Sequence, residues 1–208
     1  MPTNKGHWYD GWFYDRWIAP NQDRLFGQIK ELIERNSRVI DVGCGTGRLA
    51  FALADKCECV LGIDLSLRNI ERANRNLSVS PDHRMSFEHR SVAELALGGE
   101  ERFDYAVLTY VLHEVAERGR AQLLQDISLV ADRIIIGDYL VPRPAGVRFV
   151  LNEVVEFAAG RDHYTNFKSF VAKGGICRLI ECGHFEVIEE IRNSPHMSHL
   201  VVLQSPKG

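Results

Sequence analysis

Short apolar runs of strand length alternate along this chain with stretches whose apolar residues recur every three or four positions. The first spacing favours buried strands and the second favours amphipathic helices. The strands predicted in this way span residues 38–42, 58–64, 85–89, 103–109 and 133–138. The helices predicted between them span residues 47–56, 66–76 and 119–130. Because strands and helices alternate, the pattern predicts a doubly wound α/β fold with a mostly parallel sheet.

The alternation breaks after the fifth predicted strand, where residues 141–173 read as an insertion of helical and loop segments. A helix is predicted over residues 175–182, with Gly183 as a left-handed stop. Residues 185–191 and 199–204 are predicted to form an antiparallel pair that closes the sheet at one edge.

Composition limits the possible partners. The 208 residues suit one domain with a substantial core, and the formal net charge of −3 gives no electrostatic reason to expect nucleic acid. The apolar runs are too short to cross a bilayer, and residues 1–6 lack the apolar stretch of a signal peptide. The odd number of cysteines, 5, is typical of reduced thiols in the cytoplasm. Their spacing does not match that of zinc ligands, so no metal site is expected.

The most specific pattern lies where the first strand ends. Asp41 is followed by glycines at positions 43, 45 and 47, and a second acid, Asp64, ends the next strand. This layout is typical of a nucleotide-type site at the carboxyl edge of a parallel sheet. A dinucleotide fingerprint would need a small residue at position 48, where this chain has Arg48. The glycine spacing therefore argues against NAD and favours S-adenosylmethionine.

The motifs together resemble those of the class I (Rossmann-like) S-adenosylmethionine-dependent methyltransferases. The matching segments are residues 41–47, 62–66 and 103–108, and the resemblance covers roughly residues 37–140. Within that family the chain looks most like the small-molecule and quinone-type enzymes. The resemblance implies a seven-stranded sheet of order 3-2-1-4-5-7-6 with the last strand antiparallel, S-adenosylmethionine as cofactor and S-adenosylhomocysteine as product.

The resemblance also implies roles for individual residues. Asp41 is expected to face the amino-acid end of the cofactor, and Asp64 to accept hydrogen bonds from the ribose hydroxyls. Leu65 is expected to pack on the adenine face. The other residues expected to contact the cofactor are Gly43, Cys44, Gly45, Gly47, Thr109 and Tyr9.

The third strand departs from the family pattern, which often has an acid there for the adenine amino group. The corresponding residues here are Arg90-Ser91-Val92. Ser91 can accept one hydrogen bond from the amine, and the Val92 amide can serve a ring nitrogen. Ser91 can equally be a plain helix cap with Glu94 three residues on, forming a capping box. The two interpretations are compatible, and both stay open.

Candidate catalytic residues follow the fourth strand. Methyl transfer from a sulfonium is an in-line displacement that requires a base only when the acceptor is protonated. His113 titrates near neutral pH and is the natural candidate base, although a packing role is an equally simple interpretation. Tyr110 is a second candidate and fits a pocket wall better. Asp138, His163 and Tyr164 are polar groups that can orient an acceptor.

The N-terminal segment is rich in aromatic residues, with tryptophans at positions 8, 12 and 17. It is interpreted either as a helix anchored to the domain or as a lid whose Tyr9 and Tyr14 face the methylsulfonium, with Tyr14 a third catalytic candidate. The chain is thus expected to form a single domain. It comprises an N-terminal lid (residues 1–36), a cofactor-binding core (37–140), an acceptor-capping insertion (141–173) and a C-terminal helix with a strand pair (174–208).

The leading hypothesis is methyl transfer to a small organic acceptor. A methyltransferase acting on protein or nucleic acid is an alternative, although residues 108–111 lack the Asn-Pro-Pro-Tyr-like stretch of amino-methylating DNA enzymes. A cofactor-binding protein without turnover is a further alternative, and Arg48 speaks against an NAD-dependent oxidoreductase. The acceptor and the oligomeric state stay open.

Overall fold

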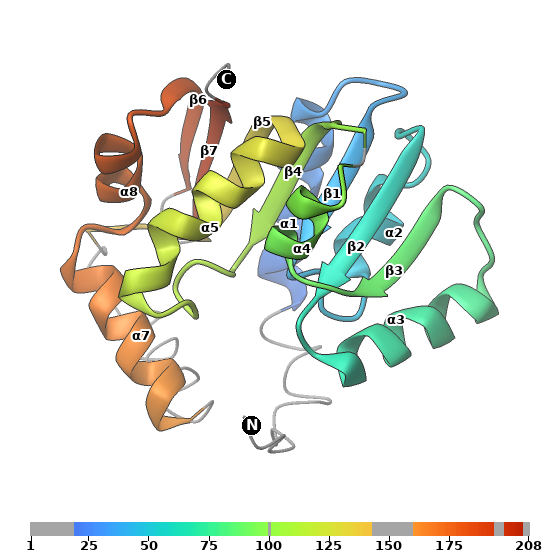
Figure 1. Ribbon diagram of the computed structural model, residues 1–208, viewed down its shortest axis with the longest axis horizontal. Helices are drawn as coiled ribbons and strands as arrows, with labels where there is room; N and C mark the ends of the chain where they lie inside the picture. Colours follow the sequence, from blue (N-terminus) through green and yellow to red (C-terminus); the bar gives the residue numbers. More distant parts are fainter. Residues whose placement is uncertain (1–18, 100, 143–159, 194–197, 206–208) are drawn as a thin grey trace.

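The computed structural model describes residues 19–99, 101–142, 160–193 and 198–205. Its strands form a seven-stranded sheet of order β3-β2-β1-β4-β5-β7-β6 (Figure 1). Neighbouring strands from β3 through β5 pair in parallel, whereas β7 pairs antiparallel with both β5 and β6. The strands are β1 (Arg38–Val42), β2 (Cys59–Asp64), β3 (Met85–His89), β4 (Phe103–Thr109), β5 (Ala131–Tyr139), β6 (Glu186–Asn193) and β7 (Ser198–Gln204). The predicted fold class, strand order and antiparallel last strand are confirmed.

Helices cover both faces of the sheet and bury two separate apolar clusters (Figure 1). The helices whose apolar residues join the first cluster are α1 (Ala19–Leu32), α2 (Arg48–Leu53) and α3 (Leu67–Val79). Those whose apolar residues join the second are α4 (Val92–Leu97), α5 (Glu117–Val130), α7 (Arg161–Ala172) and α8 (Gly175–Gly183). Because both faces are covered, the central strands are apolar nearly throughout, as Val39, Ile40, Val107 and Leu108 illustrate with no exposed surface.

The segment predicted as an N-terminal lid is described only from residue 19 onward. Its described part, α1, packs into the first apolar cluster through Leu25, Phe26 and Ile29. Leu25 lies against β5 at Gly137, where an added Cβ would stand 2.9 Å from Leu25 Cδ2. Glycine at this position therefore lets α1 approach the sheet closely. The aromatic part of the predicted lid, residues 8–17, lies outside the described residues, and its role as a lid stays a prediction.

Two local details differ from the sequence prediction. The expected left-handed stop at Gly183 is wrong, because His184 takes that conformation with φ 53°. An added Cβ at Gly183 would lie 2.5 Å from the Phe185 ring, so glycine is needed there for space. The insertion contains the regular helix α7, which the sequence pattern did not delimit. Among the described residues, no helix is long and apolar enough to span a membrane.

Candidate active site

The residues singled out from the sequence gather at the carboxyl edge of the sheet. In parallel strands this edge is shared, so the turns after β1, β2, β4 and β5 lie beside one another. The turn after β1 carries the glycine loop, β2 ends at Asp64, and β5 ends at Asp138 and Tyr139. The geometry of this edge decides what the site can hold.

The loop after β1 turns back tightly because its glycines adopt positive φ, 75° at Gly43. The amides of Gly43 and Cys44 both donate to the carbonyl oxygen of Ile63, over 2.8 and 3.0 Å. An added Cβ at Gly43 would stand 2.6 Å from Val111 Cγ2. The loop is therefore fixed to β2 on one side and pressed against the segment after β4 on the other.

A single aromatic ring, that of Phe87 on β3, fills the space beside two of the glycines. An added Cβ at Gly47, where φ is 86°, would lie 2.6 Å from Phe87 Cζ. An added Cβ at Gly62 on β2 would lie 2.5 Å from Phe87 Cδ1. Both glycines thus permit close packing inside the protein.

Gly45 differs from the other loop glycines, because an added Cβ would meet nothing within 4 Å. Its φ of 55° and its open side leave the backbone accessible to a ligand. The Gly45 amide donates to Asp64 Oδ2 over 2.9 Å, and the Ser66 amide donates to Asp64 Oδ1 over 2.7 Å. Asn69 Nδ2 also donates to Asp64 Oδ2 over 3.3 Å. Asp64 therefore holds the loop in place, and its half-buried carboxylate keeps acceptor capacity on Oδ1 for a ligand.

Asp41 is the most unusual group of the site. Its side chain is fully buried, and neither carboxylate oxygen has a hydrogen-bond partner among the described residues. Burial, and secondarily the charge of Asp64, raises the pKa of Asp41 to about 7. Buried carboxylates are normally hydrogen-bonded, so an unsatisfied one at a ligand edge fits a cationic or donor group from outside.

Around the expected adenine position the structure supports some roles and leaves others as predictions. Leu65 is 76% exposed, which is unusual for leucine and leaves its surface available to a planar ring. Ser91 and Glu94 form a complete capping box at the start of α4, so the structural interpretation of Ser91 is confirmed. Val92 is buried behind it. The contact of Ser91 with adenine stays a prediction.

Three further residues predicted to contact the cofactor have distinct placements. The Cys44 side chain is buried against Gly62, and burial raises the pKa of its thiol. Only the backbone of Cys44 thus remains for a ligand contact. Thr109, the last residue of β4, pairs with Gly137 of β5 at the same edge. Tyr9 and the catalytic candidate Tyr14 lie outside the described residues.

Directly after β4, Tyr110 adopts a left-handed backbone conformation with φ 58°, which is rare for a residue other than glycine. Its amide donates to the Gly137 carbonyl over 2.7 Å and so holds the turn. Its ring stands edge-on to Tyr139, with 5.5 Å between centroids, and 6.4 Å from the His113 ring. Strained backbone of this kind is often found at functional sites, and here it directs the chain toward His113.

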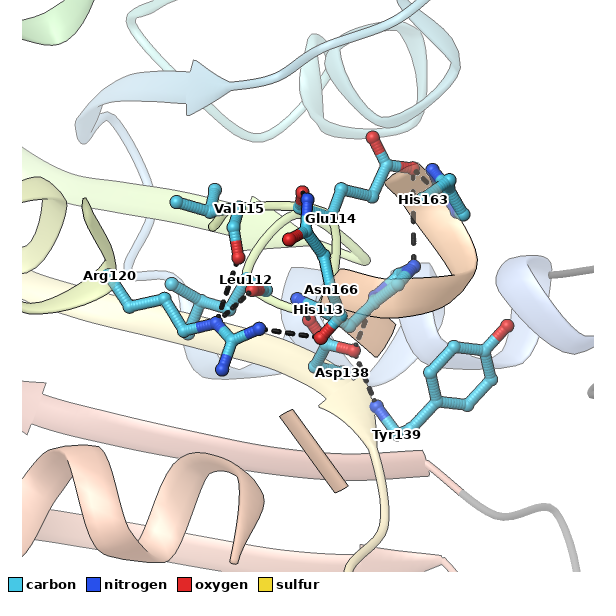
Figure 2. Close-up of polar contacts among 9 residues, drawn as sticks. All are labelled: Leu112, His113, Glu114, Val115, Arg120, Asp138, Tyr139, His163 and Asn166. Carbon is cyan, nitrogen blue, oxygen red and sulfur yellow. Dashed lines mark hydrogen bonds and ion pairs between the residues drawn. The ribbon is translucent and has the colours of Figure 1, made fainter. Parts of the chain in front are cut away.

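His113 is 2% exposed, and its Nδ1 lies 2.8 Å from Asp138 Oδ1 (Figure 2). The same carboxylate accepts the His113 amide over 3.2 Å and the Tyr139 amide over 2.7 Å. Asp138 is fully buried, so its orientation is well defined. The pairing favours the tautomer that carries the proton on Nδ1, which makes Nε2 the basic nitrogen.

Aromatic rings surround the histidine. Tyr139 and Phe167 stand edge-on to the His113 ring, with 4.8 and 6.0 Å between centroids, and His163 does so at 5.7 Å. Tyr139 and Phe167 also contact one another edge-on at 5.3 Å. This wall combines aromatic surface with imidazole nitrogens, a composition that suits an organic acceptor.

The side-chain contacts of Arg120, and of Asn166 in the insertion expected to cap the acceptor, were not predicted from the sequence. Arg120 is only 2% exposed, and its Nε donates to the carbonyl oxygens of Leu112 and Val115 (Figure 2). Its Nη2 donates to the carbonyl oxygen of Asn166 over 2.6 Å, while Asn166 Nδ2 donates to that of Glu114 over 2.8 Å. Together they tie α5, the loop after β4 and α7 into one unit.

A polar cavity of about 740 Å³ lies at the opposite, amino edge of the sheet, between Asn36, Arg102 and Asp132. It is remote from the glycine loop and from His113. We assign the ligand site to the carboxyl edge, because the unsatisfied carboxylate, the open glycine and the strained turn all lie there.

Comparison with known proteins identifies similar folds and a matching domain family. Residues 39–132, which run from β1 to the start of β5, match the family described as methyltransferase domain. The magnesium protoporphyrin IX methyltransferase of Synechocystis, solved with bound S-adenosylhomocysteine, superposes with a TM-score of 0.68 at 16% identity, covering 98% of this chain and 90% of that one. Residues 39–132 thus match a methyltransferase domain, and the chain as a whole has the fold of the superposed enzyme.

Curated relatives match over shorter stretches of this chain. A ubiquinone biosynthesis O-methyltransferase of Leptothrix cholodnii is 40% identical over 72 residues, which cover 35% of this chain and 30% of that protein. An uncharacterized RNA methyltransferase of Mycoplasma mobile is 29% identical over 84 residues, covering 40% of this chain and 23% of that protein. The matched stretches therefore span less than a third of either relative.

Proposed function

We propose that this methyltransferase transfers a methyl group from S-adenosylmethionine to a small organic acceptor. The observation that carries the proposal is the fully buried Asp41 carboxylate, unsatisfied among the described residues, beside the open Gly45 of the loop. A buried acid in this state is stabilised by a cation, and the amino-acid end of the cofactor offers an ammonium group. The sulfonium of the bound cofactor supplies the electrophilic methyl group.

The chain's own residues divide the work of binding. Asp41 would receive the ammonium group, and the loop backbone at Gly45 would approach the ligand where no Cβ intervenes. Asp64 would accept from a ribose hydroxyl through the lone pairs not used by the loop amides. The exposed Leu65 would gain apolar contact with the adenine ring.

On the acceptor side, His113 is the group we propose to receive a proton when the acceptor is a hydroxyl or an amine. The Asp138 carboxylate 2.8 Å from Nδ1 orients the ring and stabilises the imidazolium that forms. Tyr110 and Tyr139 would form the aromatic wall that excludes water. Tyr14 stays a proposed lid residue.

The charge of the protein fits a small acceptor better than a macromolecular one. The formal net charge of −3 offers no field that would attract a nucleic-acid backbone, although one relative bears the name of an RNA methyltransferase. The five cysteines are all unpaired, which agrees with the proposed cytoplasmic location. A cofactor-binding protein without turnover is the second candidate, and it makes the same prediction for cofactor binding.

Isothermal calorimetry with S-adenosylhomocysteine, with NADH as control, tests the cofactor. Micromolar binding of the first ligand and none of the second is the expected result. A subsequent screen with S-adenosylmethionine and phenol, catechol and amine acceptors, read by product mass, separates turnover from mere binding. NADH binding alone would refute the proposal, and methylation of RNA but of no small molecule would refute its acceptor class.

A further inference from the structure

Three potential metal ligands converge at the acceptor side of the site. His113 and Glu114 lie on the loop after β4, and His163 lies on α7, so that the Glu114 carboxylate stands between the two imidazoles (Figure 2). Glu114 Oε1 is 4.0 Å from His113 Nε2 and 3.9 Å from His163 Nε2. The three ligand atoms lie within 4.8 Å of one another. These separations exceed the roughly 2.7–3.2 Å of an N–H···O hydrogen bond.

We propose that His113, Glu114 and His163 bind a divalent transition-metal ion, with zinc the best match to two imidazoles and one carboxylate. Ligand atoms on a tetrahedral shell of about 2.1 Å radius lie roughly 3.4 Å apart. The two distances from Glu114 Oε1 to the imidazole nitrogens therefore need to contract by about half an ångström on binding. The two imidazole nitrogens, which lie within 4.8 Å of each other, also have to come closer. The Glu114 side chain is 55% exposed and can make that adjustment by rotation.

The surroundings of His113 are those of a metal-binding histidine. Asp138 accepts a hydrogen bond from Nδ1 over 2.8 Å and so directs Nε2 toward Glu114. Metal-ligating histidines commonly donate their other ring nitrogen to a carboxylate in this way, which fixes the tautomer and raises the basicity of the ligand. Asp138 is itself fixed by the amides of His113 and Tyr139, so the arrangement is preformed.

The two elements that carry the ligands are fixed to each other. Asn166 lies three residues after His163, on the same side of α7, and donates to the carbonyl oxygen of Glu114 over 2.8 Å. Arg120 donates to the carbonyl oxygen of Asn166 over 2.6 Å. The loop and the helix therefore cannot move apart without breaking these hydrogen bonds, which makes the cluster more than a chance meeting of surface groups.

In catalysis, where this inference rests on the proposed function, the cation acts as a Lewis acid on an oxygen acceptor. A coordinated hydroxyl has a lowered pKa and loses its proton to solvent water. The acceptor oxygen then forms its bond to the methyl carbon as the carbon–sulfur bond of the donor breaks. Nε2 of His113 cannot bind the cation and accept a proton at the same time. When the cation is bound, coordination to it therefore replaces His113 as the means of deprotonating the acceptor. Three protein ligands leave a fourth position for the acceptor.

A cobalt titration of the full chain, first stripped with a chelator, tests the site without relying on activity. One equivalent of Co²⁺ should give visible d–d absorption, and added Zn²⁺ should abolish it. His163→Ala and Glu114→Gln should each weaken binding by about a hundredfold or more, because each removes one of three ligands. Asp138→Asn should weaken it by about ten- to a hundredfold. Circular dichroism establishes that each variant is folded.

Two control variants locate the ion. His83→Ala removes an exposed histidine outside the cluster and should leave binding unchanged. Cys177→Ser tests the alternative group formed by Cys177, Glu190 and His199. A thiolate charge-transfer band, or binding that survives His163→Ala and disappears in Cys177→Ser, would overturn the assignment. The absence of any cobalt binding would also overturn the metal site, and His113 would then remain the proposed base. Calorimetry with S-adenosylhomocysteine tests the proposed function separately, so that either idea can fail alone.

Discussion

Replacing Asp41 by asparagine should stabilise the unliganded protein at neutral pH and weaken its cofactor binding. The pKa of Asp41 is raised to about 7, first by burial and then by Asp64. An aspartate in an unfolded chain titrates near about 3.9. The folded state therefore binds this proton more tightly than the unfolded state does, and the free energy of unfolding falls as pH rises from about 4 to about 7. Below about pH 4 the group imposes no cost.

The size of the stability change follows from the difference between the folded and unfolded pKa values of Asp41. The step from about 3.9 to about 7 corresponds to roughly 4 kcal/mol at pH 8, an upper bound because an asparagine amide is also left unsatisfied there. Asp41→Asn, which keeps the shape and removes the charge, should recover up to that amount at pH 8 and almost nothing near pH 4. Binding of S-adenosylhomocysteine should weaken by about ten- to a hundredfold, because a charge-assisted contact is lost.

Urea unfolding at intervals between pH 4.5 and pH 8 measures the first effect, and calorimetry at pH 8 measures the second. Asp126→Asn, at a half-buried position on α5 where the carboxylate accepts a hydrogen bond from Gln122 Nε2, is the matched control and should preserve both the pH slope and the affinity. Identical pH slopes for wild type and Asp41→Asn would refute the argument from burial. A variant that is more stable but binds with full affinity would refute the assignment of Asp41 to the ammonium group.

Four further substitutions have defined outcomes. Gly43→Ala places a Cβ 2.6 Å from Val111 Cγ2 at positive φ and should lower the free energy of unfolding, measured in urea, by about 1–3 kcal/mol. The Cβ of Gly45→Ala would meet no atom within 4 Å, so this variant should lose only about 1 kcal/mol of stability while its cofactor binding, measured by calorimetry, weakens. Asp64→Ala should weaken binding by about 1–3 kcal/mol, since it removes the ribose acceptor and releases the Gly45 amide; unchanged affinity would contradict the ribose assignment. His113→Ala should lower turnover by about 10²–10⁴-fold at saturating cofactor; a variant with full turnover would reduce His113 to a packing residue.

The central strands and the cofactor edge were predictable because their signals are local. In residues 38–42, Val39 packs on one face of the sheet and Ile40 and Val42 on the other, and a parallel sheet covered by helices on both faces requires this pattern. Asp41 and the glycines that follow lie at every second position of residues 41–47, so their proximity needs no knowledge of the fold. Capping of α4 by Ser91 and Glu94 is local in the same sense, and it was predicted as one of two compatible interpretations.

What escaped prediction depends on contacts between distant segments. His113 and Asp138 were each singled out, yet their hydrogen bond joins residues 25 positions apart and follows only from the adjacency of β4 and β5. Arg120 resembled the charged face of an amphipathic helix, but carbonyl groups from α7 and from the loop after β4 surround it. Its burial is a tertiary property that no helical periodicity expresses. The left-handed turn at Tyr110 likewise has no sequence signal, because glycine or asparagine would be expected there.

The Phe87 ring makes the rim of the sheet part of the proposed cofactor site. Phe87 belongs to β3, the outermost strand beside β2, and it fits against both Gly47 and Gly62. Outer strands open locally more readily than central ones, and each such opening would withdraw the ring that supports the loop. Ligand binding and the closed state of β3 are therefore thermodynamically linked, and amide hydrogens of β3 should exchange more slowly once the loop is occupied. The slowing of exchange at this rim would report occupancy of a site that the β3 backbone never touches.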